Sequence, residues 1–200
     1  MIICAGNSET FDFATPMGVG LIESTINLTR LCLFDKPEFL LFVGSAGSYG
    51  EQNIFDIVES KTSANIELAF LNDDAYTPLD NVVSTNTTNK QDIIVNSSNY
   101  ITTNEELAKK FLRLGIGIEN MEFFAVLKVA QEFDIPAGGV FCITNYTNKN
   151  AHDDFIKNHE KAKKIQVLHP PCHSFNYCSD HSRRSRILRL PLRPARQTPA

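Results

Sequence analysis

The sequence predicts an α/β fold: a single domain with a central mixed, largely parallel sheet flanked by helices. Short apolar stretches of strand length alternate with segments of helical periodicity, as in parallel strands joined by helices. The chain has 200 residues, of which 42% are apolar and 21% charged, enough to form a core. The continuous apolar run at 39–43 (FLLFV) favours a strand that is covered on both faces.

The expected elements follow in chain order. Strands are expected over 1–4, 39–43, 64–71, 92–96 and 137–143, and helices over 18–34, about 103–114, 121–133 and 152–165. The first helix is expected to be amphipathic, because apolar residues recur along it with helical spacing. These residues are Val19, Ile22, Ile26 and Leu33. Thr103 and Glu106 form a capping-box pattern, which predicts the start of the second helix.

Composition excludes several classes of protein. The net charge of -4 gives no whole-chain reason to expect nucleic-acid binding. No apolar run reaches the roughly 18 residues that a membrane span needs. The first residues (MIICAGNSET) lack the basic start and long apolar stretch of a signal peptide. Five scattered cysteines argue against a disulfide framework, so we expect a cytoplasmic protein.

The chain changes character near residue 167. Residues 1–166 carry a net charge of -9, whereas 167–200 carry six arginines, no lysine and one acidic residue, Asp180. The second segment also holds five of the nine prolines. We therefore expect one domain over 1–166 and a basic, Pro/Arg-rich tail over 167–200 that forms no packed structure.

Three interpretations of this tail are open. Its arginines could contact phosphates of a nucleic acid or another acidic surface. Its histidines and cysteines could bind a metal, although the two cysteines lie further apart than in common zinc sites. These residues are His169, Cys172, His173, Cys178 and His181. The third interpretation, non-native sequence read from a shifted frame, is favoured because arginine replaces lysine completely, so neither metal nor nucleic acid is expected as a partner.

Polar segments follow three of the expected strands, at 44–50, 96–103 and 143–150. In open α/β sheets, ligands bind beyond the carboxyl ends of the strands. Ser45, in a loop of small residues, could contact an anion or a planar ligand, and a glutamate in 119–125 could bind the two hydroxyls of a ribose. Asn145 could bond a heterocycle through its amide, and Tyr100 could stack on it. Each segment also has a structural interpretation: a tight turn, a carboxylate at a helix start, an Asx turn, or simple packing.

Four motifs together resemble the nucleoside phosphorylase/nucleosidase superfamily, which includes purine nucleoside phosphorylase, uridine phosphorylase and methylthioadenosine/S-adenosylhomocysteine nucleosidase. They are VGLI at 19–22, FVGSAG at 42–47, NME at 120–122 and ITN at 143–145. The resemblance covers essentially residues 1–165, and it depends on the order and spacing of the motifs.

The resemblance implies a role for each candidate residue. Glu122 would hold the ribose hydroxyls and Asn145 would stabilise charge on the leaving base, so both are expected to be catalytic. Gly6 and Ser45 are expected to bind phosphate. The residues expected to contact the nucleoside are Ser45, Ala46, Gly47, Tyr100, Asn120 and Met121.

The function implied is that of a purine nucleoside phosphorylase, a pentosyltransferase that cleaves a purine nucleoside with inorganic phosphate. No metal or organic cofactor is implied, and a homo-oligomer is. Two positions depart from the family: Asn145 stands where many members have an aspartate, and Phe42 where bacterial phosphorylases often have an arginine. An amide at position 145 is compatible with a 6-oxopurine base.

Two alternatives stay open. A nucleosidase of the methylthioadenosine/S-adenosylhomocysteine type would use water in place of phosphate, and Glu9 is the nearby candidate for the base that activates it. A nucleoside-binding protein with weak catalysis would also explain the two departures. Release of free base, with and without phosphate, separates these functions.

Overall fold

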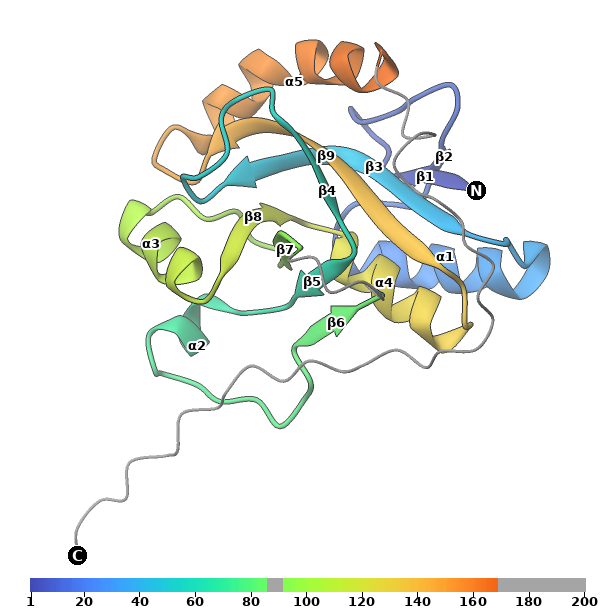
Figure 1. The fold of residues 1–200 in the computed structure, drawn as a ribbon, viewed down its shortest axis with the longest axis horizontal. Helices are drawn as coiled ribbons and strands as arrows, with labels where there is room; N and C mark the ends of the chain where they lie inside the picture. Colours follow the sequence, from blue (N-terminus) through green and yellow to red (C-terminus); the bar gives the residue numbers. More distant parts are fainter. Residues whose placement is uncertain (86–91, 169–200) are drawn as a thin grey trace, which may run out of the picture.

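A nine-stranded mixed sheet lies at the centre of the computed structural model, which describes residues 1–85 and 92–168 (Figure 1). Parallel and antiparallel strand pairs both occur, and the expected α/β fold is confirmed. The strands are β1 (Ile2–Cys4), β2 (Thr15–Pro16), β3 (Leu40–Ser48), β4 (Ile57–Ser60), β5 (Thr62–Ala64), β6 (Val82–Ser84), β7 (Ile94–Ser97), β8 (Ile116–Asn120) and β9 (Ala137–Tyr146).

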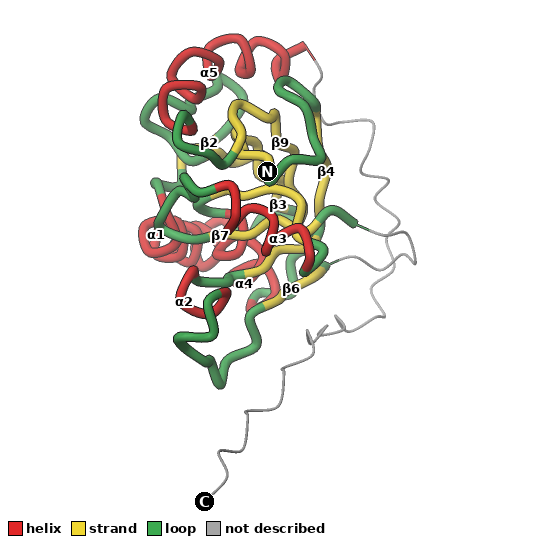
Figure 2. Tube along the Cα trace, turned by 90° about the vertical axis from the view of Figure 1, so that its left-hand side faces the viewer, coloured by secondary structure: helices red, strands yellow, loops and turns green. Residues whose placement is uncertain are grey.

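Helices cover the sheet from both sides. Helix α5 packs on β9 and β3, whereas α4 packs on the other side and against α1, as Figures 1 and 2 show from two directions. The short α3 lies against β8. The helices are α1 (Gly20–Asp35), α2 (Leu68–Leu71), α3 (Glu105–Arg113), α4 (Phe123–Glu132) and α5 (Ala151–Leu168).

Strand β3 organises the region that forms the site. It runs parallel to β1 and β9, and its last two residues, Gly47 and Ser48, pair antiparallel with β8. A register shift between Ala46 and Gly47 accompanies this change of neighbour. The ends of β3, β8 and β9 are therefore brought together at one edge of the sheet.

A cluster of three phenylalanines anchors the core between the sheet and α4. Phe42, Phe123 and Phe141 are fully buried, with ring centroids 5.0 to 6.3 Å apart. Rings at these separations gain attraction beyond the burial of their surface. Phe42, at the position where bacterial phosphorylases often have an arginine, therefore belongs to the core and brings no charge to the site.

The expected strand at 64–71 is wrong over most of its length. Strand β5 ends at Ala64, and Leu68–Leu71 form the short helix α2. The apolar run is explained by packing, because Leu68, Phe70 and Leu71 lie on a second core cluster around Phe111. Sequence alone does not separate such a buried helical turn from a strand.

Two segments expected to be loops continue as strands. Strand β3 extends through the small residues to Ser48, and β9 extends to Tyr146. Small residues fit here because β3 is covered on both sides and its backbone is approached closely. The candidate residues of both segments therefore stand on strands.

Helix α1 forms where it is expected, but most of the apolar stripe named for it does not face the core. Its buried residues are Gly20, Ser24, Leu28 and Cys32. Ile22, Ile26 and Leu33 are 68%, 54% and 56% exposed. Small residues beside Leu28 allow the close approach of α4; of the stripe named above, Val19 packs against the core and the other three residues are left outside.

The C-terminal helix passes its expected end at residue 165. It continues to Leu168, and Gln166 is buried with its amide donating to the carbonyl of Gly44 at 2.8 Å. The remaining tail, 169–200, with the residues considered for metal and nucleic-acid binding, lies outside the described residues. None of the helices in 1–85 and 92–168 has the length and apolar character needed to cross a membrane. Cys4, Cys32 and Cys142 are buried free thiols.

Candidate active site

One cavity of about 280 Å³ gathers the candidate residues that the sequence pointed to. From the sequence-predicted set it is lined by Gly6, Glu9, Ser45, Ala46, Gly47, Tyr100, Asn120, Met121, Glu122 and Asn145. It is also lined by residues that were not assigned a role: Ala5, Asn7, Ser8, Val19, Ser98, Ile101, Glu119, Ala151, His152 and Phe155. The structure thus brings Glu122 and Asn145 to a single cavity, as one small ligand touching both would require.

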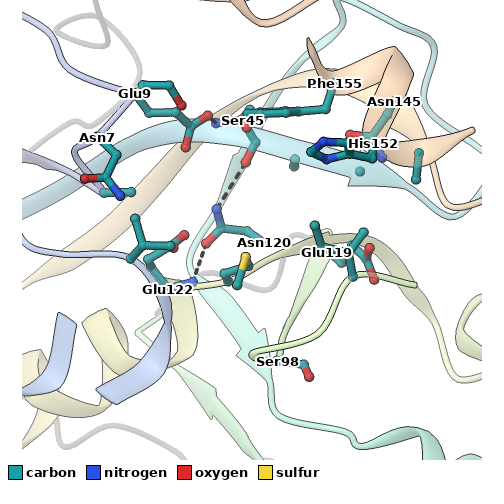
Figure 3. Close-up of a pocket in the computed structure, with 18 of the residues that line it drawn as sticks. Asn7, Glu9, Ser45, Ser98, Glu119, Asn120, Glu122, Asn145, His152 and Phe155 are labelled. Atoms are coloured by element: carbon teal, nitrogen blue, oxygen red, sulfur yellow. Dashed lines mark hydrogen bonds between the residues drawn. The ribbon is translucent and has the colours of Figure 1, made fainter. Parts of the chain in front are cut away.

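The cavity has two chemically distinct ends. Figure 3 shows Glu9, Asn7 and Glu122 toward one end, and Asn145, His152 and Glu119 toward the other. Asn120 and Ser45 lie between them. The first end carries two carboxylates, and the second carries an amide, an imidazole and a third carboxylate.

Glu122 is held at the junction of β8 and α4. The side-chain oxygen of Asn120 accepts the backbone N–H groups of Glu122 and Phe123, at 2.9 and 3.0 Å, and so closes the start of α4. The first N–H of α1, from Gly20, donates to Oε1 of Glu122 at 2.9 Å. One carboxylate oxygen is thereby fixed between two helix starts, at the lining of the cavity.

Burial dominates the electrostatics of Glu122, which is 3% exposed. Loss of water raises its pKa from 4.5 to about 7, the bond from Gly20 acts in the opposite direction, and the negative charge of Glu9 raises it further. The carboxyl group therefore titrates in the range where many enzymes work.

Glu9 closes the same end of the cavity from the turn after β1. This turn is held by mutual backbone hydrogen bonds between Gly6 and Glu9, with Gly6 at φ 100° and Asn7 at φ 53°. The Glu9 carboxylate accepts the backbone N–H of Ser45 at 3.0 Å. Burial raises the pKa of Glu9, and its hydrogen bonds with Ser45 oppose that rise.

Asn120 connects the two sides of the cavity floor. Its amide nitrogen donates to the carbonyl of Ser45 at 3.1 Å, while its oxygen caps α4 (Figure 3). The backbone of Ser45 is therefore bonded on one side to Glu9 and on the other to Asn120. The N–H and C=O of this residue, expected to serve a phosphate site, are both engaged by protein groups.

Asn145 stands on β9 with its amide oriented by its neighbours. The hydroxyl of Thr144 donates to its oxygen at 2.9 Å, and its nitrogen donates to the carbonyl of Tyr146 at 3.3 Å. An amide nitrogen carries two hydrogens, so one N–H is left to donate to a ligand. A side-chain carbon at Gly47 would come within 3.0 Å of this nitrogen, so the small residue keeps the amide accessible.

Glu119 lies in the segment 119–125 that was expected to supply a glutamate, but the resemblance gave the role to Glu122 and none to Glu119. It lies on β8, buried and lining the cavity, where it accepts Tyr49 Oη at 2.9 Å and the N–H of Thr102 at 3.0 Å. Burial raises its pKa, and the bonds from Thr102 and Tyr49 lower it. The place of Glu119 at the cavity could not be predicted, because β8, an antiparallel neighbour of β3, was not expected as a strand.

A loop and helix α5 form the cavity wall at the end that carries Asn145, His152 and Glu119. Tyr100, expected to stack on a base, lines the cavity but is 74% exposed. His152 and Phe155 lie in the first two turns of α5, and Phe155 stacks on His159 at 5.4 Å between ring centroids. The signal for them was the helix start directly after the Asn145 strand, because such a helix begins at the same edge of the sheet.

The donor set of the cavity suits an organic ligand. Among residues 1–85 and 92–168, no group of three or more histidine, cysteine, aspartate or glutamate side chains is placed to hold a metal ion. The cavity instead combines carboxylates, amides and backbone groups, which match hydroxyls and heterocyclic nitrogens.

Sequence comparison finds one matching family. A family model described as the phosphorylase superfamily matches residues 90–166, which contain Tyr100, Glu122 and Asn145. Comparison with curated proteins finds no significant match.

Three solved structures with a similar fold are nucleosidases or hydrolases by name. A mutant MTAN of Helicobacter pylori with 5'-methylthioadenosine in its active site has a TM-score of 0.67 and 17% identity, covering 78% of this chain and 76% of that one. Futalosine hydrolase of Helicobacter pylori has a TM-score of 0.67 and 18% identity, covering 78% and 75%. Streptococcus pneumoniae MTA/SAH nucleosidase in complex with 8-aminoadenine has a TM-score of 0.66 and 14% identity, covering 84% and 94%.

At these identities the structural likeness establishes the fold. Taken with the family match over the segment that carries NME and ITN, it confirms that the chain resembles the nucleoside phosphorylase/nucleosidase superfamily, as its motifs predicted.

Proposed function

We propose that this protein is a nucleosidase, which cleaves the N-glycosidic bond of a purine nucleoside with water. The observation that carries this proposal is the Glu9 carboxylate bonded to the Ser45 N–H at 3.0 Å. A phosphate bound there would have to displace a carboxylate and share the site with its charge. A water molecule beside Glu9 could instead give a proton to its carboxylate, which would act as the general base.

The sugar would occupy the end of the cavity between Glu9 and Glu122. Oε2 of Glu122 would accept a ribose hydroxyl, while Oε1 stays on the N–H of Gly20. Charge-assisted bonds of this kind hold a substrate in one orientation. Met121 lines the same cavity and would pack against the ribose.

The bond-breaking step follows from this placement. The C–N bond breaks as the ribose takes on positive charge, and the electron pair passes to the base. The remaining N–H of Asn145 would donate to the ring nitrogen or oxo group that receives this charge. Glu9 takes a proton from water as its oxygen bonds to the anomeric carbon. The base leaves as an anion and takes a proton from solvent, and Glu9 returns to solvent the proton it took from water, so the products are ribose and the neutral free base.

Phosphorolysis is the second candidate, supported by a cation near the sugar end. Lys163 donates to the carbonyl of Ser8 at 3.0 Å, and its charge, with that of His159, lowers the pKa of Glu9. A cation there would also attract inorganic phosphate. The family that matches residues 90–166 is described as the phosphorylase superfamily, which is compatible with this reaction.

A phosphate-dependence assay separates the candidates. The full chain is incubated with inosine, guanosine, adenosine and methylthioadenosine, with and without phosphate, and free base is measured. Base release without phosphate supports the nucleosidase, and release that requires phosphate supports the phosphorylase and contradicts the main proposal. Binding without release would indicate a nucleoside-binding protein.

The variant Glu9→Gln tests the proposed base directly. Glutamine can still accept the Ser45 N–H but cannot take a proton from water, so we expect kcat to fall by about 10²- to 10⁴-fold. Glu132→Gln, at the exposed far end of α4, is the matched control and should leave kcat unchanged. A normal rate in Glu9→Gln would rule out its assigned role.

A further inference from the structure

Glu119 belongs to a row of three residues that crosses the sheet beneath the cavity. Gly47 on β3 is paired with Glu119 on β8 and with Asn145 on β9. Residues paired in this way project from the same face, and neighbouring strands lie about 4.8 Å apart. Glu119 and Asn145 therefore stand on either side of a glycine.

Because Gly47 has no side chain, space is left between Glu119 and Asn145. A side-chain carbon at position 47 would come within 3.0 Å of the Asn145 nitrogen and 3.3 Å of Glu119 Cγ. Both side chains thus flank the space above Gly47, and both line the cavity. A planar ring lying over Gly47 would meet the amide at one edge and the carboxylate at another.

The two edges offer opposite hydrogen-bonding groups. Asn145 has one N–H left to donate, since its other N–H is bonded to the carbonyl of Tyr146; its oxygen accepts the Thr144 hydroxyl and keeps a second lone pair. Glu119 accepts Tyr49 Oη on one oxygen and the N–H of Thr102 on the other, with a further hydrogen bond from the Thr102 side chain, and the two carboxylate oxygens together can accept about four. The described lysines and arginines form no ion pair with Glu119. When it is ionised, the Glu119 carboxylate can therefore only accept further hydrogen bonds and has none to donate.

A 6-oxopurine matches this arrangement better than adenine. It presents acceptors, N7 and O6, along one edge and an N1–H donor on the next. Adenine presents a lone pair at N1, which would face the carboxylate without a proton between them. A buried polar group left without its partner is costly, so a mismatch of this kind gives strong discrimination.

We propose that Glu119 is a specificity-determining residue that binds the N1–H edge of the base and selects 6-oxopurine nucleosides over adenine nucleosides. This inference rests on the proposed function, because it assumes a nucleoside in this cavity. The alternative is that Glu119 only braces the loop through Thr102 and the side chain of Tyr49.

The test compares kcat/KM for inosine and adenosine in three forms of the full chain. Wild type should prefer inosine. Glu119→Gln, which loses the charge and half of the acceptor capacity, should reduce kcat/KM for inosine by about 10- to 100-fold while adenosine is spared. Tyr49→Phe removes a brace and keeps the carboxylate, so it should retain the preference even if it lowers the melting temperature.

Two results would overturn the proposal. One is an unchanged inosine-to-adenosine ratio in Glu119→Gln. The other, which needs no variant and holds even if Glu119→Gln fails to fold, is equal kcat/KM of wild type for inosine and for 1-methylinosine, which lacks the N1–H.

Binding of free bases keeps this test separate from the proposed function. If wild type cleaves neither nucleoside, hypoxanthine and adenine are titrated calorimetrically into wild type and Glu119→Gln. Stronger binding of hypoxanthine that is lost in the variant supports the role of Glu119 although the reaction is not the one proposed. Equal binding of both bases to wild type refutes that role.

Discussion

Glu122 shows how a buried carboxylate links activity to stability. Its pKa in the folded protein is about 7, raised from 4.5 chiefly by burial. The folded state therefore holds this proton more tightly than the unfolded state. The resulting stabilisation is present below about pH 4.5 and is lost as pH rises through about 7.

Glu122→Gln should consequently be more stable than wild type at neutral and alkaline pH. The amide still accepts the N–H of Gly20, and the cost of a buried charge is removed. We expect its free energy of unfolding to exceed that of wild type by about 1 to 3 kcal/mol above pH 7, and the difference to vanish near about pH 4. Denaturant unfolding at both pH values measures this, and a constant difference would contradict it.

The same residue should be indispensable for cleavage. Glu122→Ala removes the group that would hold the sugar, so nearly all base release should disappear. Base release by wild type should also rise with pH through about 7, because the ionised form is the better acceptor for a hydroxyl. A near-normal rate in Glu122→Ala would refute the role.

Gly47→Ala should weaken turnover by crowding the Asn145 amide. The added carbon would lie 3.0 Å from that nitrogen. Gly117→Ala is a matched control, because it meets Ile93 Cγ2 at the same 3.0 Å but lies outside the cavity lining. We expect kcat/KM to fall at least several-fold in Gly47→Ala alone, measured beside the melting temperatures of both variants.

The residues predicted from sequence and those that were missed differ in a physical way. Asn145 follows an apolar run, so the rule for strand ends selected its segment, whereas Glu122 was expected from its place at a helix start and from the NME motif of the resemblance. Glu119 and Phe155 reach the cavity through pairings that sequence does not specify: the antiparallel contact of β8 with β3, and the packing of α5 on β9.

Helix α3 illustrates how far local patterns specify an element. The helix was expected, but its N-cap is Asn104 and not Thr103. The Asn104 oxygen accepts the N–H groups of Glu106 and Leu107 at 2.9 and 3.4 Å. Glu106 does not reach back to complete a capping box; its carboxylate pairs with Lys109 at 2.6 Å. A shift of one residue is thus decided by side-chain geometry that spacing does not reveal.

Asn104→Ala should lower the free energy of unfolding by about 1 kcal/mol, the usual cost of losing an N-cap. Thr103→Ala is the matched control, since Thr103 is exposed and precedes the cap. We expect it to change stability by less than about 0.5 kcal/mol. Chemical denaturation compares the two, and equal effects would argue against Asn104 as the cap.

Helix α1 shows why hydrophobic periodicity identified the helix and not its buried face. The side that meets α4 is built from glycine, serine and cysteine around Leu28, which carry little apolar signal. The stronger apolar stripe points outward. An apolar stripe on a helix predicts that this face is buried, but it does not show whether the same chain or a second one buries it.

At the scale of the whole molecule, this outward stripe supports the expectation of a homo-oligomer. Ile22, Ile26, Leu33 and Phe34 are all more than half exposed. The start of α1 is bonded to the loop that carries Tyr100, since the N–H of Leu21 donates to Asn99 Oδ1 at 2.9 Å. A second copy seated on this stripe would therefore lie close to the mouth of the cavity.

Ile26→Glu should convert the expected oligomer to a monomer, because a buried unpaired charge at an apolar interface is strongly unfavourable. Light scattering at matched concentration measures the mass. Ile156→Glu, which places the same charge at a similarly exposed site on α5, should leave the mass unchanged. A monomeric wild type would contradict the expectation.

The division of the cavity into two ends has a practical consequence for redesign. The sugar end is built by helix starts and a turn, whereas the row of Glu119, Gly47 and Asn145 belongs to three neighbouring strands. Exchanging side chains along that row leaves the bonds that fix Glu9 and Glu122 in place. Libraries restricted to positions 119 and 145 should therefore yield catalysts with new heterocycle tolerance, without rebuilding the machinery that acts on the pentose.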